Sequence, residues 1–287
     1  MPSEFDLRGL NCTKIPNTSL DIVGGTSHFS GGLCLRWSLE EKKLTTISCQ
    51  GDFESHEITI PEGIEFWGID AGPLANSTEA IYHQARIATL MGRKIILGLA
   101  PEVLENEMGE KHLANMSADA WRAIRDLIPE SISGALFLES HGTLEEDDAI
   151  VEPDTRYRVR LATEHPIYEN ERAQKFVRFM EMLNSKSLHP DARYFFMGAA
   201  GELMIQSHFS YDHRCNLGNK ESDLLVRLAR EMGKFEGIFG AKLSGNGDST
   251  RVAILCDRKQ NTEVDLAIDT IVAKYKRQMN KKPEILE

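Results

Sequence analysis

The sequence predicts a mixed α+β protein made of two structural units, residues 1–150 and 151–287. Short alternating segments typical of strands dominate the opening part, and apolar residues three or four positions apart, typical of helices, dominate the second half. Charge differs too, because residues 1–150 carry 24 acidic and 11 basic side chains and residues 151–287 carry 20 and 22. The acidic run 145–148, followed by Pro153, is the predicted boundary, since like charges and a proline resist packing.

Composition and charge narrow the functional class. The chain of 287 residues is 41% hydrophobic with a formal net charge of −11, which is typical of a soluble globular protein and argues against binding to nucleic acid or to an anionic membrane. It shows no signal peptide and no apolar run near the roughly 18 residues of a membrane helix, so we expect a cytoplasmic protein. The five scattered cysteines predict neither a disulfide framework nor a metal site.

The first unit begins with strands. Alternating apolar residues predict strands over 33–39 and 43–49, joined by a tight hairpin, and two more over 56–60 and 64–70. Residues 20–37 lead into them with two Gly-Gly pairs around a polar stretch. Such a loop could grip a polyhydroxylated ligand through hydrogen bonds, although a plain loop is the simpler interpretation.

Two helices complete the first unit. Helical spacing begins at Ser77, with Gly92 as the expected stop. A second helix is expected over 117–128, where Ser117 is a good N-cap and Pro129 ends the helix.

The second unit combines helices with one pair of strands in a layered α+β arrangement. Its expected helices and strands are the helices 168–184, 194–210, 221–232 and 262–280 and the strands 237–244 and 251–256. The last helix is expected to begin at Thr262, with acidic residues near its positive end and basic residues near its negative end.

The turn between the two late strands could bind an anion. Ser244, Gly245, Asn246 and Gly247 end a strand, and glycines there allow backbone amides to cradle a phosphate. Lys242 could add a cation. A plain turn and a solvated lysine are the simpler interpretations.

Residues 157–172 crowd charged and hydroxyl side chains into a short stretch, among them Arg160 and Tyr168. This density is typical either of a polar pocket or of an exposed ion-pair network. His208 and His213 fit no standard zinc spacing, so we expect hydrogen-bonded histidines there.

Several long motifs resemble one enzyme family. Residues 201–229 and 237–247 resemble the closing segments of sugar kinases of the GHMP superfamily, the galactokinases and especially the L-arabinokinases. Four earlier segments resemble upstream motifs of that family in the same order: residues 64–72, 84–96, 129–139 and 165–176. The resemblance is therefore nearly continuous from about Lys43 to Cys256. At the front, 19–37 resembles the first motif, in which Arg-Leu-Asp leads to an Asp-Tyr-Ser-Gly sugar-binding loop.

The resemblance implies the GHMP kinase fold, with a curtailed β-rich amino-terminal domain and a ferredoxin-like carboxy-terminal domain. It implies transfer of the γ-phosphoryl group of ATP to the anomeric hydroxyl of a monosaccharide such as L-arabinose or galactose, with ATP and Mg²⁺ as cofactors if the protein is active. The expected contacts are Gly245 and Gly247 to a nucleotide phosphate, and Asp21, His28, Arg160 and Tyr168 to the sugar. The glycines and Asp21 rest on matching motif positions, and the other three on local chemistry.

Parts of the family's machinery have no counterpart in this sequence. Between Leu39 and Lys43 the resemblance passes over the family segment that holds a Gly-rich phosphate loop and the Asp of a Met-Asp-Gln stretch. Ser19 stands where the family has Arg, His28 and Phe29 stand where it has Asp-Tyr, and a loop with several more glycines is reduced to 245–250. We therefore name no catalytic residue.

Two explanations of the gap stay open. Either the gene model has lost an internal stretch, or the chain descends from a sugar kinase and no longer needs catalysis; the changes at Ser19 and His28 favour the second. The functional hypothesis is an L-arabinokinase-like or galactokinase-like protein with weak or no phosphoryl transfer, a pseudokinase. The alternative is a non-catalytic sugar-sensing or kinase-partner module, which could dimerise with a complete kinase. A fragment that does not fold stably is the third hypothesis.

Overall fold

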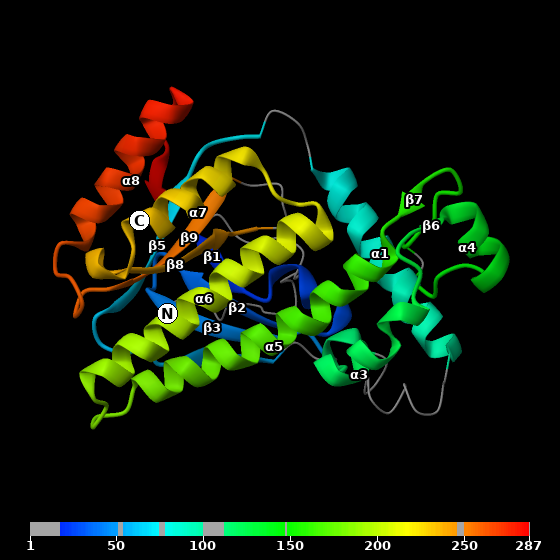
Figure 1. Ribbon diagram of the computed structural model, residues 1–287, viewed down its shortest axis with the longest axis horizontal. Helices are drawn as coiled ribbons and strands as arrows, with labels where there is room; N and C mark the ends of the chain where they lie inside the picture. The colour runs from blue at the N-terminus through cyan, green and yellow to red at the C-terminus, as the bar shows by residue number, and fades with distance from the viewer. Residues whose placement is uncertain are drawn as a thin grey trace, which may run out of the picture.

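Two antiparallel sheets of four strands form the centre of the molecule. The computed structural model describes residues 18–50, 54–74, 78–99, 112–146, 148–245 and 250–286. The first sheet has the order β1-β2-β3-β4, with β1 Ser19–Val23, β2 Leu33–Ser38, β3 Lys43–Ser48 and β4 Ser55–Ile58. The second has the order β10-β5-β9-β8, with β5 Ile64–Asp70, β8 Ile238–Leu243, β9 Arg251–Asp257 and β10 Glu284–Leu286 (Figure 1). The mixed α+β class expected from the sequence is confirmed.

Long helices cover the sheets. α5 (Val159–Leu183) and α6 (Pro190–Cys215) lie side by side as an antiparallel pair (Figure 1) and bury Phe176, Met180 and Met204 against Leu20 and Phe66 of the two sheets. α7 (Lys220–Met232) and α8 (Val264–Met279) enclose a second core on the other sheet. Each core buries about twenty apolar side chains, which at roughly 1.5–3 kcal/mol each provides the main driving force for folding.

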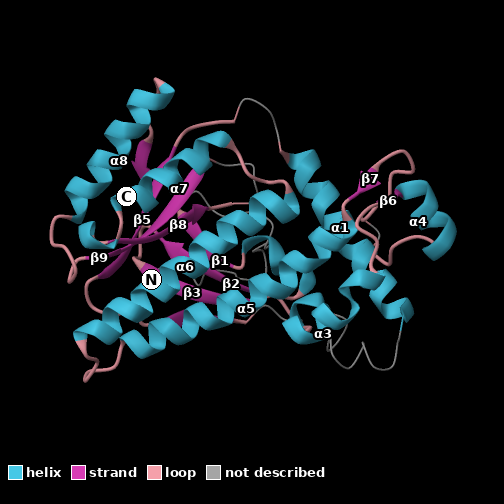
Figure 2. Ribbon diagram, in the orientation of Figure 1, coloured by secondary structure: helices cyan, strands magenta, loops and turns pink. Residues whose placement is uncertain are grey.

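A third core lies at the right of the view in Figure 2. It joins α1 (Glu79–Leu99), α3 (Ala118–Ile124), α4 (Gly134–His141) and the ribbon of β6 (Ile132–Ser133) and β7 (Arg156–Tyr157) to the first half of α5. Short 3-10 helices complete the described fold at Gly25–Ser30, Leu113–Asn115, Arg125–Leu127 and Lys234–Glu236. Ser117 caps α3 as expected, since its side chain accepts a hydrogen bond from the backbone N–H of Ala120.

Two helix predictions were wrong for the same reason, a close contact between α1 and α5. Gly92 does not end α1: a Cβ atom there would lie 1.7 Å from Thr163 Oγ1, so the glycine lets the two helices approach. α5 begins at Val159 rather than 168 and continues through Pro166. Proline has no N–H to donate to the carbonyl of Ala162, and Thr89 Oγ1 of α1 donates to that carbonyl instead, at 3.0 Å.

The sequence also missed several elements. Residues 19–23, expected within a loop, form strand β1, and α4 and β10 were not anticipated. α6 extends beyond the expected 194–210 at both ends, and α8 begins at Val264 without a side-chain cap from Thr262. The expected boundary near residue 150 stays a prediction; the second sheet pairs β5 with β9 and β10, so both expected units contribute to it.

A four-residue turn joins β2 to β3. Ser38 pairs with Lys43 and Leu33 with Ser48, so the two strands stay in register along their whole length. The backbone N–H of Lys42 donates to the carbonyl of Ser38, and Lys42 adopts a left-handed φ of 55° that closes the hairpin. All four residues between the paired ends of β2 and β3, 39–42, therefore belong to the turn.

Candidate functional site

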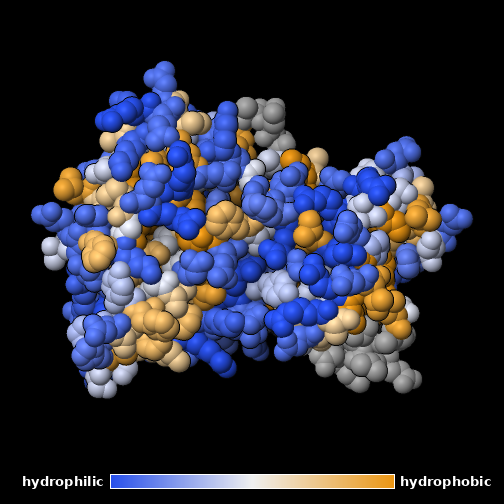
Figure 3. All heavy atoms as spheres, viewed as in Figure 1, coloured by the Kyte–Doolittle hydropathy of each residue, from blue (hydrophilic) through white to orange (hydrophobic). Residues whose placement is uncertain are grey.

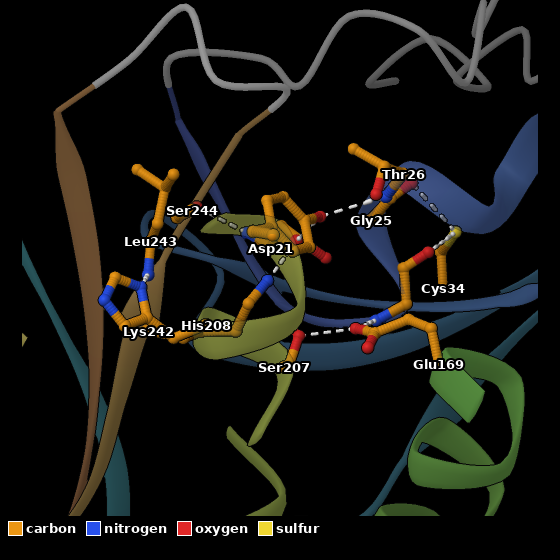
Figure 4. A network of polar contacts seen from close by, with 12 residues as sticks. Asp21, Gly25, Thr26, Cys34, Glu169, Ser207, His208, Lys242, Leu243 and Ser244 are labelled. Carbon is orange, nitrogen blue, oxygen red and sulfur yellow. Dashed lines mark hydrogen bonds and ion pairs between the residues drawn. The ribbon is translucent and has the colours of Figure 1, made fainter. Parts of the chain in front are cut away.

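The loop after β1 is the candidate site, because a network of buried polar side chains lies beneath it (Figure 4). It runs from Gly24 to Gly31, and both glycines have positive φ, 98° and 76°. A Cβ atom at Gly24 would lie 2.0 Å from the carbonyl oxygen of Leu33, and one at Gly25 would lie 1.8 Å from the hydroxyl of Tyr211. Close packing thus requires glycine at Gly24 and Gly25, and the left-handed backbone at Gly24 favours glycine as well.

Asp21, Lys242 and Tyr211 form a buried polar cluster under this loop. Lys242 Nζ lies 2.5 Å from Asp21 Oδ2, and the Tyr211 hydroxyl donates to the same oxygen at 3.0 Å. The ammonium also lies 4.4 Å from the centre of the Tyr211 ring. Burial and the nearby Asp21 carboxylate raise the pKa of Tyr211 well above its usual value, so its hydroxyl stays protonated. Lys242 is 0% exposed, so its interpretation as a solvated strand residue was wrong.

The same cluster fixes the backbone on both sides of the loop. The N–H of Asp21 donates to Ser244 Oγ at 2.7 Å, which ties β1 to the end of β8. The N–H of Thr26 donates to the Tyr211 hydroxyl at 2.9 Å. Asp21 Oδ1 is buried and accepts no hydrogen bond from any described residue, although Oδ2 is fully engaged.

Glu169 of α5 holds the start of the loop. Its Oε1 accepts from the N–H of Gly24 at 2.9 Å and from Ser207 Oγ, and its Oε2 accepts from Arg172 at 2.7 Å. Burial opposes ionisation of this carboxyl, but the Arg172 guanidinium and other cations outweigh it and hold the pKa of Glu169 at about 2. Glu169 is therefore ionised and bound within the protein.

Two histidines beside the loop are neutral. Burial lowers the pKa of His165 to about 3, and its ring lies between Thr26 Oγ1 at 2.5 Å and Ser210 Oγ at 2.8 Å. Burial likewise lowers the pKa of His28 to about 4. His28 Nδ1 donates to the carbonyl of Gly25 at 2.7 Å, so Nε2 accepts from the Tyr82 hydroxyl at 3.1 Å.

His28 also belongs to an aromatic group. Its ring stacks with Tyr82 at 6.4 Å and meets Phe29 edge-on at 5.3 Å, as measured between ring centres. The position at which the family has a carboxylate thus carries a neutral ring whose two nitrogens are both bonded to the protein. This ring is uncharged and packs against the loop.

The structure brings some of the expected ligand contacts together and separates others. Asp21 lies on β1, and His28 lies on the loop that follows this strand. Gly245 comes directly after Ser244, whose hydroxyl accepts a hydrogen bond from the N–H of Asp21. Gly247 lies outside the described residues. Arg160 and Tyr168 do not join this cluster.

Arg160 and Tyr168 lie on α5 in other surroundings. Arg160 donates to the carbonyl of Ile128 at 2.8 Å and lies 3.4 Å from Glu130, so it ties α5 to the segment after α3. The Tyr168 ring lies beneath the guanidinium of Arg214, 5.5 Å from the ring centre. The polar stretch 157–172 is therefore divided between two faces of one helix, and only Glu169, Arg172, His165 and their neighbours reach the loop.

Sequence reasoning missed the central partners of the site. Tyr211 and Ser207 lie on a helix whose pattern signals only packing, and the burial of Lys242 is not visible from its strand. The one available signal was the spacing of Glu169 and Arg172, which places a carboxylate and a guanidinium on one helical face.

The described residues around the loop do not fit a magnesium site. The structure holds no group of three or more His, Cys, Asp or Glu side chains able to bind a metal ion among the residues it describes. The two buried carboxylates of the site are already neutralised, Asp21 by Lys242 and Glu169 by Arg172. Magnesium needs oxygen ligands that are not already bound to protein cations.

Comparisons with known proteins support the expected lineage. No protein-family profile matches the chain. L-arabinokinase from Arabidopsis thaliana is 27% identical over an alignment of 246 residues that covers 75% of this chain and 23% of the relative. The crystal structure of Lactococcus lactis galactokinase complexed with galactose is similar over 85% of this chain and 50% of that one, with a TM-score of 0.56 and 16% identity.

The two similarities have different weight. The structural likeness shows the galactokinase fold, and the GHMP kinase fold expected from the sequence is confirmed. The sequence similarity to an L-arabinokinase agrees with the expected resemblance to galactokinase-like sugar kinases of the GHMP superfamily. The chain spans about a quarter of the length of the curated relative and half of the galactokinase chain. No described helix is long and apolar enough to cross a membrane.

Proposed function

We propose that this galactokinase-like chain binds a monosaccharide, with L-arabinose and galactose as the first candidates, and transfers phosphate from ATP weakly or not at all. The observation that carries the proposal is the turn between β2 and β3. Four residues close it in register, where the family's sequence holds the phosphate loop and the Asp that follows. Phosphoryl transfer depends on positioning and on charge stabilisation around the phosphates, and those parts have no place here.

The polar network supports retention of a binding role. Gly24 N–H, Asp21 N–H and Thr26 N–H each donate to a buried side chain, so the loop has a fixed shape before any ligand arrives. A preorganised loop lowers the entropic cost of binding. The many buried hydrogen bonds to the Gly24–Gly31 loop favour a binding role for it, and such a role does not require the family's phosphate loop.

Asp21 gives the sugar a specific contact in this proposal. Its Oδ1 has no hydrogen-bond partner among the described residues, and a buried acceptor left unpaired costs about 1–3 kcal/mol. A sugar hydroxyl donating to Oδ1 would remove that cost, while Lys242 and Tyr211 hold Oδ2. Arg160 and Tyr168 remain sequence predictions without support from their surroundings, and Gly245 and Gly247 remain the predicted phosphate contacts if ATP binds.

Thermal unfolding with ligands tests the proposal. A ligand that binds only the folded state at a hundred times its Kd stabilises it by about 2.7 kcal/mol, which raises the Tm by several degrees. We expect such a shift with L-arabinose or galactose, and none beyond it when Mg-ATP is added. Asp21→Asn should abolish the sugar shift, and Asp191→Asn, at an exposed aspartate in the first turn of α6, should keep it. The absence of a sugar shift in the wild type would contradict the binding role.

A partner role is the second candidate, supported by exposed aromatic side chains. Phe195 is 66% exposed at the start of α6 and contacts Phe196, which stacks on Phe179 of α5. Figure 3 shows apolar side chains gathered over these helix ends, at the lower left. Light scattering on the purified chain tests this role: a dimer that dissociates in Phe195→Ser would favour it, and a monomer at high concentration would oppose self-association.

A further inference from the structure

Three arginines line a hollow that is formed by residues of α1, β7, the start of α5 and the end of α6. Figure 1 shows these elements. The volume of the hollow is about 280 Å³. The polar side chains that line it are those of Gln84, Arg156, Arg158, Arg214, Cys215 and Asn216. No acidic residue lines it among the described parts of the chain.

Such a lining is unusual for this protein. The chain carries a net charge of −11. A larger hollow of about 640 Å³ pairs two of the three cations that line it with acids in its own walls, Arg193 with Asp257 and Lys259 with Glu62. In the arginine hollow, Arg214 Nε bonds to Glu164 at 3.1 Å, and Glu164 lies outside the lining. Two guanidinium charges remain in excess over that pair. Like charges held together repel, so their convergence favours an anion between them.

Each of the three arginines is anchored by contacts within the protein. Arg156 Nε donates to Ser131 Oγ at 2.9 Å, and the Arg158 guanidinium donates to the carbonyl of His213 at 2.8 Å. Arg214 is held by Glu164 and lies over the Tyr168 ring. A guanidinium has five N–H donors, so these anchors orient the side chains and leave donors for a ligand.

The remaining walls suit an anion as well. Burial raises the pKa of Cys215 to about 12, so its thiol adds no negative charge to the hollow. Arg158 is also the N-cap residue of α5, a helix of 25 residues without a side-chain cap, so the positive end of this helix faces the same region. Gln84 donates to the carbonyl of Arg156 and fixes α1 against β7.

We propose that this hollow is a binding site for the phosphate group of a small molecule. A phosphate dianion matches two or three guanidinium groups better than a carboxylate does, because it offers more acceptor oxygens and more charge. The volume admits a phosphate with a small substituent. None of the residues that line the hollow is a predicted sugar contact, so the two proposals can be tested separately.

Isothermal titration of the full chain with inorganic phosphate, in buffers matched in ionic strength with chloride, tests the site. We expect saturable binding to the wild type and at least a tenfold weaker affinity in Arg156→Gln/Arg158→Gln. Arg227→Gln/Arg230→Gln removes the same two charges from exposed positions of α7 and should stay within twofold of the wild type. Arg156→Lys/Arg158→Lys should give an intermediate affinity, because lysine keeps the charge but loses the fork.

A parallel titration with glycerol 3-phosphate, a phosphate monoester without a sugar ring, identifies the form of the ligand. Tighter binding than inorganic phosphate would assign a phosphate monoester, and weaker binding would assign free phosphate; both support an anion site here. If the α7 control variant lost as much phosphate affinity as Arg156→Gln/Arg158→Gln, the net charge of the protein would explain the effect, and the proposal would be overturned. So would the absence of phosphate binding beyond chloride. Because no sugar or ATP is present, neither result depends on the sugar proposal.

Discussion

Replacing Lys242 by methionine should strongly destabilise the protein, because it removes one charge of a buried ion pair. The side chain is 0% exposed, and its ammonium lies 2.5 Å from Asp21 Oδ2. Methionine has a similar length but no charge, so Asp21 would remain buried with the Tyr211 hydroxyl as its only partner on that oxygen. Removing one member of a buried ion pair costs about 3–5 kcal/mol, a large share of the roughly 5–15 kcal/mol that stabilises a typical domain.

Urea unfolding followed by tryptophan fluorescence measures this loss. The double variant Lys242→Met/Asp21→Asn removes both charges and should recover about 1–3 kcal/mol of it, which a double-mutant cycle reports as the coupling between the two residues. Lys276→Met, at an exposed position near the end of α8, is the matched control and should change the unfolding free energy by no more than about 0.5 kcal/mol. A loss below about 1 kcal/mol in Lys242→Met, or no coupling with Asp21, would refute the buried ion pair.

Three further predictions concern the loop and its supports. Because the folded pKa of Glu169 is about 2, below its usual value, its contribution is present above about pH 4.5 and is lost as the pH falls toward 2; Glu169→Gln should therefore flatten that part of the stability profile measured by urea unfolding, by about 3 kcal/mol. Gly25→Ala should lower the Tm, since its Cβ would overlap the Tyr211 hydroxyl, whereas Gly98→Ala, in an open and exposed part of α1, should raise stability by about 0.5–1 kcal/mol in calorimetry. His28→Asp restores the family's carboxylate but places it against a backbone carbonyl, so we expect a lower Tm and no gain in ADP formation, and a gain would contradict the structural role of this ring.

The sequence foretold the elements with strong periodicity and missed those decided by tertiary contacts. Strands β2, β3 and β5 alternate clearly, and α7 shows an apolar face with an Asn219 cap, so local patterns suffice. β1 has only five residues followed by glycines, which local patterns cannot separate from a loop. The passage of α5 through its proline depends on a hydroxyl from another helix, which no local pattern contains.

The same division holds at the site. Asp21 and the glycines of the loop are visible from the sequence because backbone geometry and motif position both mark them. The burial of Lys242 beside Asp21 joins residues 221 positions apart, and the role of Tyr211 depends on the way α6 crosses β1. Long-range pairs of this kind follow from the packed fold, so sequence reasoning assigned Lys242 to solvent.

Phosphorus NMR of the purified chain with Mg-ATP and each of L-arabinose and galactose tests the central claim most directly. Active kinases turn over at about 1–100 s⁻¹, and a chain without a phosphate loop should fall far below that range. We expect the ATP signals to persist with no sugar phosphate signal, while the sugar still raises the Tm of the same preparation. Accumulation of a sugar 1-phosphate at a rate near that of active kinases would contradict the account, because the four-residue turn between β2 and β3 would then not prevent phosphoryl transfer.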